Sequence, residues 1–300
     1  MMAKIAVLLA AYNGESFIVS QVNSILFQLG VDVDIYIRDD GSTDSTVSTI
    51  ERFSELSNVF ILKDSESTRS AAGNFFRILS QVELGFYDYI AFSDQDDIWD
   101  PEKMSRAVSK MSEGGFEGYS SDLVAYSNSK GQASYLKKSY PSKEFDYLFQ
   151  GASAGCTYVM TSKLATTVAQ SIAHLHSSDF IGRSHDWLVY AIARAHNMQW
   201  CYDYYAPIFY RQHSSNVYGA MTTLQGLLAK VKLVRDGWYR SNVLWIAEYC
   251  GAGEKEAKIL ALVKNYSFFD RLKLMAHSGS FRRKKSECRV LGVFFLLGLF

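Results

Sequence analysis

The sequence predicts an α/β fold, with a mostly parallel central sheet that helices cover on both faces. Two observations predict it. Over the first 130 residues, short apolar runs alternate with segments whose apolar residues are spaced as on a helix. A polar cluster also follows each of the first four apolar runs. Because ligands of parallel sheets bind at the carboxyl ends of the strands, these clusters are expected to form one binding edge.

The strands and helices follow from these patterns in chain order. Apolar runs bounded by polar residues predict buried strands at 5–10, 34–38, 59–62 and 89–92. The helical spacing between them predicts helices at 18–29, 47–53 and 73–82. Later segments predict strands at 123–126, 156–160 and 207–210, and helices after Pro101 and at 186–194.

The composition permits one large domain, or one domain with an appendage, and it excludes several classes of protein. The 300 residues include 31 basic and 31 acidic side chains, so the formal net charge is zero and nucleic acid is not an expected partner. Four widely spaced cysteines form no CxxC pair. Their spacing argues against a disulfide framework or a zinc site. It is typical of proteins in a reducing cytoplasm.

The motif Asp94-Gln95-Asp96 follows the fourth predicted strand. Side chains alternate along an extended backbone, so both carboxylates are expected on the same face. A divalent cation with oxygen ligands, Mg²⁺ or Mn²⁺, would relieve their repulsion and would carry substrate phosphates as further ligands. The alternative is an acidic loop that caps the next helix, since Asp100 and Pro101 are typical of a helix start.

Three segments together resemble one enzyme family. They are Leu9-Ala10-Ala11-Tyr12-Asn13-Gly14, Asp39-Asp40-Gly41-Ser42-Thr43-Asp44 and Asp94-Gln95-Asp96-Asp97-Ile98-Trp99. In this order and spacing they resemble the family 2 glycosyltransferases, over roughly residues 3–215. The resemblance implies the GT-A fold, a Rossmann-like sheet with helices on both faces, and inverting transfer of a sugar from a nucleotide diphosphate.

The resemblance also implies roles on the nucleotide side of the site. Ala10, Tyr12 and Glu15 would frame the base and the ribose. Asp39 would bond the pyrimidine ring, because a carboxylate at such a turn can accept the N3–H of uracil or thymine. Plain capping of the next helix is the alternative for that turn. Arg69 would face the diphosphate, with an ordinary surface position as its alternative.

On the diphosphate side, the resemblance places Mn²⁺ or Mg²⁺ on Asp96, where the ion would stabilise the leaving group as a Lewis acid. Asp94 would contact the ribose or the sugar. Arg211 and His213 are similar to the family's motif on this side, and His213 would be a further metal ligand. A structural role is the alternative for His213, as it is for any lone histidine.

Inverting transfer requires a base, because the acceptor hydroxyl loses its proton as it attacks the anomeric carbon. Asp186 matches the family's base position at a helix start. The alternative is an early-helix acid that interacts favourably with the helix dipole. His185 could instead be the base, although a neighbouring histidine more often has a positioning role. His185 and Trp187 are expected on the diphosphate or acceptor side.

Within the family, three further segments make the chain most similar to bacterial rhamnosyltransferase-type enzymes: Gly155-Cys156-Thr157, His185-Asp186-Trp187 and the run 210–216. The expected reaction is transfer of L-rhamnose from dTDP-rhamnose to a surface-polysaccharide or lipid-linked glycan. A UDP-hexose is the alternative donor. A second alternative is a non-catalytic scaffold subunit that binds a nucleotide sugar, and the intact carboxylates argue against it.

The expected organisation is a glycosyltransferase domain over 1–220, followed by a helical extension over 221–300. The nucleotide-binding half is expected at about 1–100 and the acceptor half at about 101–220.

The end of the chain combines positive charge with apolar residues. Seven basic residues and one acidic residue lie over 271–289, and the run 290–300 has no charge. This run is too short to span a membrane, which takes about 20 apolar residues. The sequence therefore predicts contact with the anionic cytoplasmic face of the membrane. The alternatives are a helix packed on the protein body and a contact within a homodimer.

Overall fold

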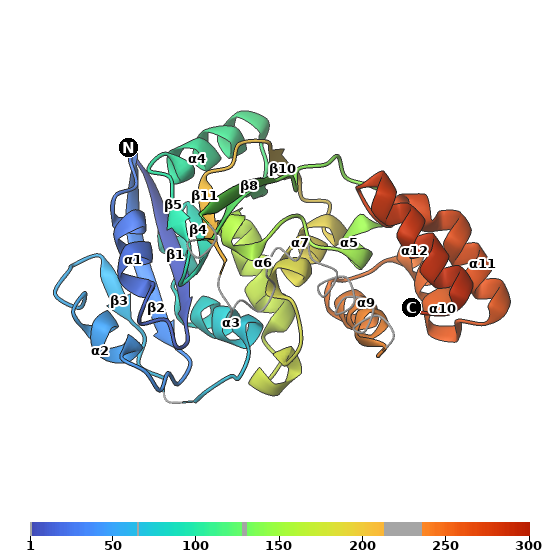
Figure 1. Ribbon diagram of the computed structural model, residues 1–300, viewed down its shortest axis with the longest axis horizontal. Coiled ribbons are helices and arrows are strands. Elements are labelled where there is room, and N and C mark those ends of the chain that lie inside the picture. Colours follow the sequence, from blue (N-terminus) through green and yellow to red (C-terminus); the bar gives the residue numbers. More distant parts are fainter. Residues whose placement is uncertain (1, 65, 128–130, 213–235) are drawn as a thin grey trace. The chain divides into compact units, whose positions relative to one another are not determined.

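The computed structural model describes residues 2–64, 66–127, 131–212 and 236–300. A seven-stranded sheet forms the core of its N-terminal part (Figure 1). In spatial order the strands are β10 (Trp200–Asp203), β6 (Gly118–Ser121), β9 (Val159–Thr161), β4 (Tyr89–Asp94), β1 (Ala3–Ala11), β2 (Val31–Asp39) and β3 (Val59–Ile61). Strand β9 runs antiparallel to its neighbours β4 and β6, and the other neighbouring pairs are parallel. The prediction of a mostly parallel sheet is confirmed.

Helices cover both faces of this sheet. The β1 side chains 5–9 are all fully buried, although consecutive side chains of a strand point to opposite faces. One face packs against α1 (Ile18–Leu26) and α4 (Lys103–Gly114) in the main hydrophobic core. On the other face, α3 (Ala71–Gln81) contacts β1 and α6 (Ser162–Ile172) contacts β4. Burial on both sides explains why this strand is a continuous apolar run in the sequence.

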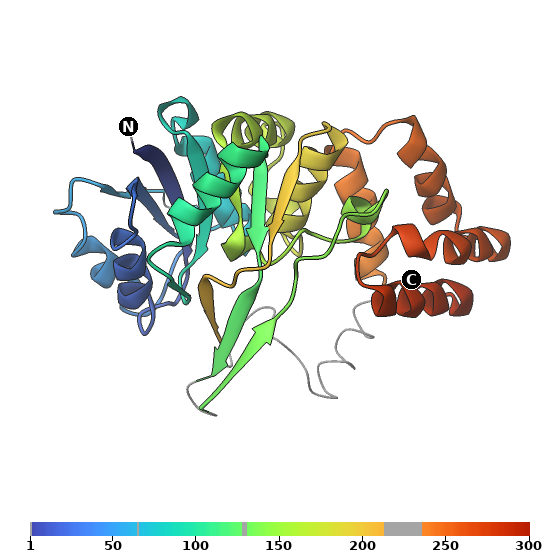
Figure 2. The same ribbon diagram turned by 90° about the horizontal axis from the view of Figure 1, so that it is seen from above.

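A smaller sheet lies beside the end of β4. Its strands, in order, are β5 (Ile98–Trp99), β11 (Ile208–Arg211), β7 (Leu123–Ser127) and β8 (Gln132–Leu136). Figure 2 shows the antiparallel β7–β8 pair as adjoining green arrows. Because β5 pairs with β11, this sheet fixes the far end of the loop that carries Asp96, one of the predicted metal ligands.

The predicted elements before residue 115 are confirmed, and the later part of the chain shows the differences. The predicted strand 156–160 is a 3₁₀ turn over Gly155–Thr157 followed by β9. The turn forms because Thr157 bonds back to the Ala154 carbonyl through its N–H (3.0 Å) and its hydroxyl (2.7 Å). Strands β6, β8 and β10 have no apolar run that would predict them, since polar residues and tyrosines interrupt each one.

The chain divides into two compact units, and the division differs from a single boundary near 220. The first unit consists of Met1–Ser139, Ser153–Asp186 and Met198–His213, and the second of Tyr140–Ala152, Trp187–Asn197 and Ser214–Phe300. Two internal segments join the second unit because of their buried side chains. Phe149, for example, stacks on Phe281 with ring centroids 4.1 Å apart.

The remaining helices complete the two units. They are α2 (Thr46–Glu51), α5 (Asp146–Phe149), α7 (His185–Ala195), α9 (Trp238–Tyr249), α10 (Glu254–Asn265), α11 (Phe268–His277) and α12 (Lys285–Leu297), the last three drawn in orange to red in Figure 1. The predicted helical extension is confirmed over 236–300, and residues 221–235 lie outside the described part. Among the helices that the structure describes, none has both the length and the apolar character to cross a membrane.

Candidate active site

The loops after β1 and β2 are bonded to each other at the carboxyl edge of the sheet. The Asn13 N–H donates to Ser42 Oγ (2.7 Å), and Asn13 Oδ1 accepts from the Thr43 N–H (2.8 Å). The Ser45 N–H donates to Glu15 Oε2 (2.8 Å). Glu15, predicted to frame the ribose, therefore also ties these two loops together.

Gln95 connects the loop after β4 to the same edge. Its Oε1 accepts from the Tyr12 N–H (2.8 Å), and its Nε2 donates to the Tyr12 carbonyl (2.7 Å). Ala10 is in register with Asp94 on the neighbouring strand. The Tyr12 side chain is 55% exposed, so its ring is available to stack on a base. The structure thus brings Ala10, Tyr12 and Asp94 to one edge.

Asp39 shapes the turn at the end of β2. Its carboxylate accepts hydrogen bonds from the Gly41 N–H (2.9 Å), the Ser42 N–H (2.8 Å) and the Ser42 hydroxyl. These bonds hold the turn itself; helix α2 begins only at Thr46 and has Ser45 as its N-cap, so Asp39 does not cap that helix. A carboxylate has about four lone-pair positions, so a further bond to a pyrimidine ring is compatible with this turn and stays a prediction.

Arg38 is a buried cation beneath this edge, and the sequence reasoning missed it. Its Nη1 donates to Asp40 Oδ1 (2.8 Å) and to Asn74 Oδ1 (2.9 Å), and its Nη2 donates to the Glu66 carbonyl. Asp40 also accepts from the Thr68 N–H (2.7 Å). The network joins the loops after β2 and β3. An arginine directly after the apolar residues 35–37 of a strand, two residues before an aspartate, is the sequence signal that could have indicated it.

We expect Arg38→Met to destabilise the protein by about 3 kcal/mol, because it leaves the buried Asp40 carboxylate without its cation. Urea unfolding measures the change. Arg77→Met is the matched control, since the Arg77 side chain is 41% exposed and its pair with Asp64 should contribute about 1 kcal/mol or less. Equal losses in the two variants would contradict the structural role given to Arg38.

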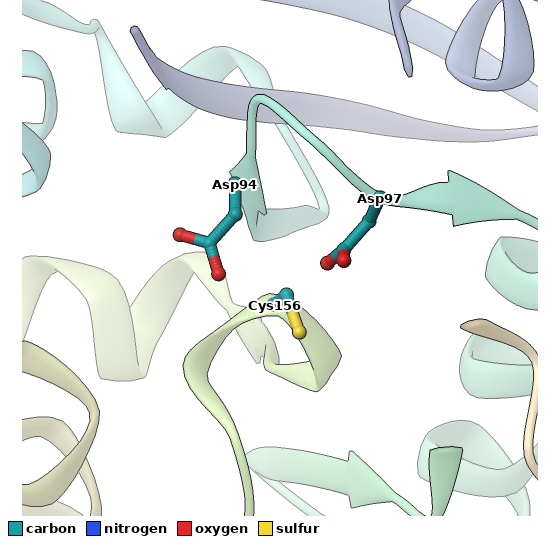
Figure 3. Close-up of side chains that lie close together, drawn as sticks. All are labelled: Asp94, Asp97 and Cys156. Carbon is teal, nitrogen blue, oxygen red and sulfur yellow. The ribbon is translucent and has the colours of Figure 1, made fainter. Parts of the chain in front are cut away.

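Asp94, Asp97 and Cys156 form the centre of the candidate site (Figure 3). One ligand atom from each of the three lies within 4.8 Å of the others. Burial, followed by the negative charges of Asp96 and Asp186, raises the pKa of Asp94 to about 7. The structure therefore brings four carboxylates from two chain segments together, and a third segment adds the Cys156 thiol.

These residues fit a divalent cation. Asp97 is fully buried, and among the described residues no donor lies in full hydrogen-bond geometry to its carboxylate oxygens, although the Cys156 thiol and the Arg211 N–H approach them. Clustered carboxylate oxygens of this kind are the ligands that Mg²⁺ and Mn²⁺ prefer. The close group contains Asp94 and Asp97, whereas the sequence places the metal on the half-buried Asp96. His213, the other predicted ligand, lies outside the described residues.

Lys103 is a second buried cation that the sequence reasoning did not identify. Its side chain is fully buried, and its Nζ lies 3.5 Å from the centroid of the Trp99 ring. Burial lowers the pKa of Lys103 to about 7, and the nearby Cys156 and Asp97 oppose this change. Lys103 therefore places a titratable positive group behind the carboxylates.

His185 and Asp186 begin helix α7 at the edge of this group. The His185 ring packs against Phe75 and Phe92, with centroids 4.2 and 5.3 Å away. Burial lowers the pKa of His185, which favours a neutral imidazole. The Ser184 hydroxyl donates to Asp186 Oδ1 (2.7 Å) and so orients that carboxylate. This packing favours a positioning role for His185 and leaves Asp186 as the candidate base.

Gly155 lies against these two residues. A Cβ at this position would overlap His185 Nε2 and would lie 3.3 Å from the Asp186 Cβ. The His185 ring is packed against Phe75 and Phe92, so the start of α7 must shift if Gly155 gains a side chain.

We expect Gly155→Ala to slow the sugar transfer that the resemblance implies by about 100-fold, because a misplacement of about 1 Å at a reacting group has this effect. Nucleotide binding should change little. Gly85→Ala is the matched control, since nothing lies within 4 Å of the added Cβ. Steady-state turnover and nucleotide titration measure the two effects. An unchanged turnover number for Gly155→Ala would contradict the close packing.

Arg211 and Tyr210 approach the site from β11. The Arg211 Nε donates to the Asp96 carbonyl (3.1 Å), and its guanidinium lies 5.1 Å from the centroid of the Phe17 ring. Burial and the nearby Asp94 raise the pKa of Tyr210, so its phenol stays neutral. The structure thus places the predicted Arg211 beside the Asp94–Asp97 loop and adds Tyr210, which the sequence analysis did not assign.

Two predicted residues are not part of this group. Trp187 is buried in the second unit, where its indole N–H donates to the Tyr147 carbonyl (2.9 Å). Its burial is explained by core packing of that unit. Arg69 is exposed on the loop after β3 with a left-handed backbone (φ 55°), and its contact with a diphosphate stays a prediction.

Comparisons of the sequence with known proteins identify the family to which this site belongs. The sequence model of the family described as "Glycosyl transferase family 2" matches residues 6–163. The chain is 37% identical to the dTDP-rhamnosyl transferase RfbG of Shigella flexneri over 241 residues, which cover 80% of this chain and 83% of that protein. It is also 31% identical to the UDP-Glc:alpha-D-GlcNAc-diphosphoundecaprenol beta-1,3-glucosyltransferase WfaP of Escherichia coli. That match extends over 110 residues, which cover 37% of this chain and 42% of that protein.

Among solved structures, the crystal structure of S. aureus TarS 1–349 matches with a TM-score of 0.59 and 13% sequence identity. The match covers 99% of this chain and 80% of that chain. The complex of the same protein with UDP-GlcNAc matches with the same TM-score and identity. At this identity the likeness shows the fold, a GT-A-like α/β fold with a mixed central sheet. By its sequence, the chain belongs to glycosyl transferase family 2.

Proposed function

We propose that this protein transfers L-rhamnose from dTDP-rhamnose to a surface-polysaccharide or lipid-linked glycan, with inversion at the anomeric carbon. The observation that carries the proposal is the 37% identity to a dTDP-rhamnosyl transferase over 80% of the chain. A UDP-hexose is the alternative donor, because a second relative carries UDP-Glc in its name.

Asp186 is the proposed base. The acceptor oxygen forms its bond to the anomeric carbon while the bond from that carbon to the diphosphate oxygen breaks. The hydroxyl proton passes to the Asp186 carboxylate, and the nucleoside diphosphate leaves with the bonding electron pair. The position of Asp186 at the start of α7, oriented by Ser184 and close to Asp94, supports this assignment.

The loop 94–97 is the proposed metal site, with Asp94, Asp96 and the buried Asp97 as its oxygen donors for Mn²⁺ or Mg²⁺. When bound, the ion would stabilise the leaving diphosphate as a Lewis acid. Arg211 would add positive charge on the same side, because its guanidinium is bonded to the Asp96 carbonyl. Tyr12 would stack on the base, and His213 stays a proposed further ligand.

The acceptor is proposed to be linked to a membrane lipid. Two Escherichia coli relatives are named for acting on a diphosphoundecaprenol-linked GlcNAc. A lipid-linked acceptor would require the enzyme to work at the cytoplasmic face of the membrane as a peripheral protein. A homodimer formed through the C-terminal segment is the alternative assembly.

Donor turnover tests the proposal. Purified protein is incubated with bacterial lipid extract and either dTDP-rhamnose or a UDP-hexose, with Mn²⁺, and the released nucleoside diphosphate is measured. We expect dTDP-rhamnose to be used at least about tenfold faster, since a few pocket contacts discriminate donors by this factor. Faster use of a UDP-hexose would overturn the rhamnose assignment. Nucleotide binding without turnover of any donor would favour the scaffold alternative.

A further inference from the structure

We propose that one exposed face of helix α12 docks the protein on an anionic lipid bilayer. The inference rests on the proposed function, in which the acceptor is linked to a membrane lipid. Its structural evidence comes from the second unit alone. The α12 face consists of Lys285, Arg289, Val290, Val293, Leu296 and Leu297.

Helix α12 has a buried side and an exposed side. Its buried residues are Cys288, Leu291, Gly292 and Phe295. Because a helix advances about 100° per residue, these four positions lie on one side and the α12 face lies on the other. The apolar residues of the α12 face, Val290, Val293, Leu296 and Leu297, are 52%, 50%, 44% and 61% exposed. Four large apolar side chains on one exposed helix face indicate an interaction surface.

Positive charge continues this apolar surface toward the start of the helix. Lys285, Arg289, Val293 and Leu297 follow one another at four-residue steps, so they form one row along α12. Lys285 and Arg289 are both exposed. The row therefore has a cationic end and an apolar end, so positive charge lies next to the exposed apolar side chains, a combination that strengthens binding to anionic lipid.

The start of α11 adds exposed aromatic side chains near the apolar end. Phe268 is 55% exposed and Phe269 is 71% exposed. The end of α12 lies beside the start of α11, because the Phe300 N–H donates to the Tyr266 hydroxyl (3.2 Å). Exposed aromatic rings are favoured in the interfacial layer of a bilayer.

Charge favours a bilayer over a second copy of this chain as the occupant. Glu287 is the one acidic residue in 284–300, and it accepts two hydrogen bonds from Arg282 (3.0 and 2.7 Å). A second copy seated on the α12 face would bury Lys285 and Arg289 without an acidic partner from that face. Anionic headgroups would neutralise both cations while the acyl layer receives the apolar side chains. With 13 residues, α12 is too short to span and would lie in the surface.

The test is co-sedimentation of the full chain with vesicles of phosphatidylcholine, with and without phosphatidylglycerol. We expect the protein to bind the anionic vesicles and to be released at high salt. The double variants Val293→Ser/Leu297→Ser and Lys285→Gln/Arg289→Gln should each bind at least about tenfold more weakly. Val19→Ser changes a 43% exposed valine on α1 and is the matched control, which should bind like the unmodified protein.

Unchanged binding by both double variants would overturn the proposal, as would equal binding to neutral and anionic vesicles. A concentration-dependent dimer that Val293→Ser/Leu297→Ser dissociates would assign the α12 face to a second copy. Unfolding temperatures check that each variant is folded. The two proposals fail separately: sugar transfer by a protein that does not bind vesicles refutes the docking face alone, and vesicle binding without transfer refutes the proposed function alone.

Discussion

Asp186→Asn is expected to lower the rate of sugar transfer by about 1,000-fold, since an amide cannot take the acceptor proton and a general base contributes roughly 10²–10⁴-fold. Donor binding should be unchanged. The substitution keeps the size of the side chain and its bond to Ser184, because the Asn oxygen can still accept from that hydroxyl. The turnover number should therefore fall while the donor KM stays close to its original value.

Two variants sharpen this experiment. Asp179→Asn is the matched control, because Asp179 is an exposed carboxylate in the preceding 3₁₀ turn, where it accepts from the His176 N–H (2.9 Å). It should transfer sugar normally. His185→Gln tests the alternative base. Near-native transfer by Asp186→Asn, together with loss in His185→Gln, would show that the base is His185.

The second large effect is expected for Asp96→Ala, which should weaken metal-dependent binding of the nucleoside diphosphate by at least about 100-fold. The change removes one carboxylate beside Asp94 and Asp97, so the proposed cation would be held by less negative charge. Binding measured without metal should change little, because the predicted base contacts, Tyr12 and Asp39, are on other loops.

Asp100→Ala is the control for this effect. Asp100 lies four residues further on, and its Oδ1 accepts from the Glu102 N–H (2.9 Å) at the start of α4. Asp100→Ala should lower the stability of the fold without changing the metal dependence of nucleotide binding. Asp97→Asn distinguishes the two candidate ligands, since the structure groups Asp97 with Asp94. If nucleotide binding stays fully metal-dependent in Asp96→Ala but loses this dependence in Asp97→Asn, the metal ligand is the buried Asp97 and not Asp96.

The parts of the fold that the sequence predicts are those with a local signal. Strands β1 and β4 contain continuous apolar runs, at 5–11 and 89–92, because helices bury both of their faces, and β2 contains a shorter run at 35–37. Strand β6 carries two serines that are buried through sheet pairing and tertiary contacts, so no local pattern marks it as a strand. Residues 140–152 and 187–197 belong to the second unit because of long-range aromatic packing. A domain boundary at one sequence position cannot describe such a discontinuous unit.

In the candidate site, too, the sequence predicts only those residues that have a local signal. Asp94, Asp96 and Asp186 occur in motifs, so a resemblance can find them. Lys103 and Tyr210 lie near these carboxylates because of how α4 and β11 pack, and no local pattern in the sequence shows that their side chains reach this site. Trp187 shows the reverse case, since it lies within a motif but its side chain belongs to the core of the second unit.

The central claim is that the carboxyl edge of the sheet binds a nucleoside diphosphate through a metal on the 94–97 loop. Thermal unfolding of the unmodified protein and of Asp96→Ala, with dTDP, UDP, GDP and CMP and with or without Mn²⁺, tests it most directly. A ligand at about 100 times its Kd adds about 2.7 kcal/mol of stability. We expect a Mn²⁺-dependent shift with dTDP or UDP that Asp96→Ala loses. The absence of a shift with every nucleotide would contradict the claim.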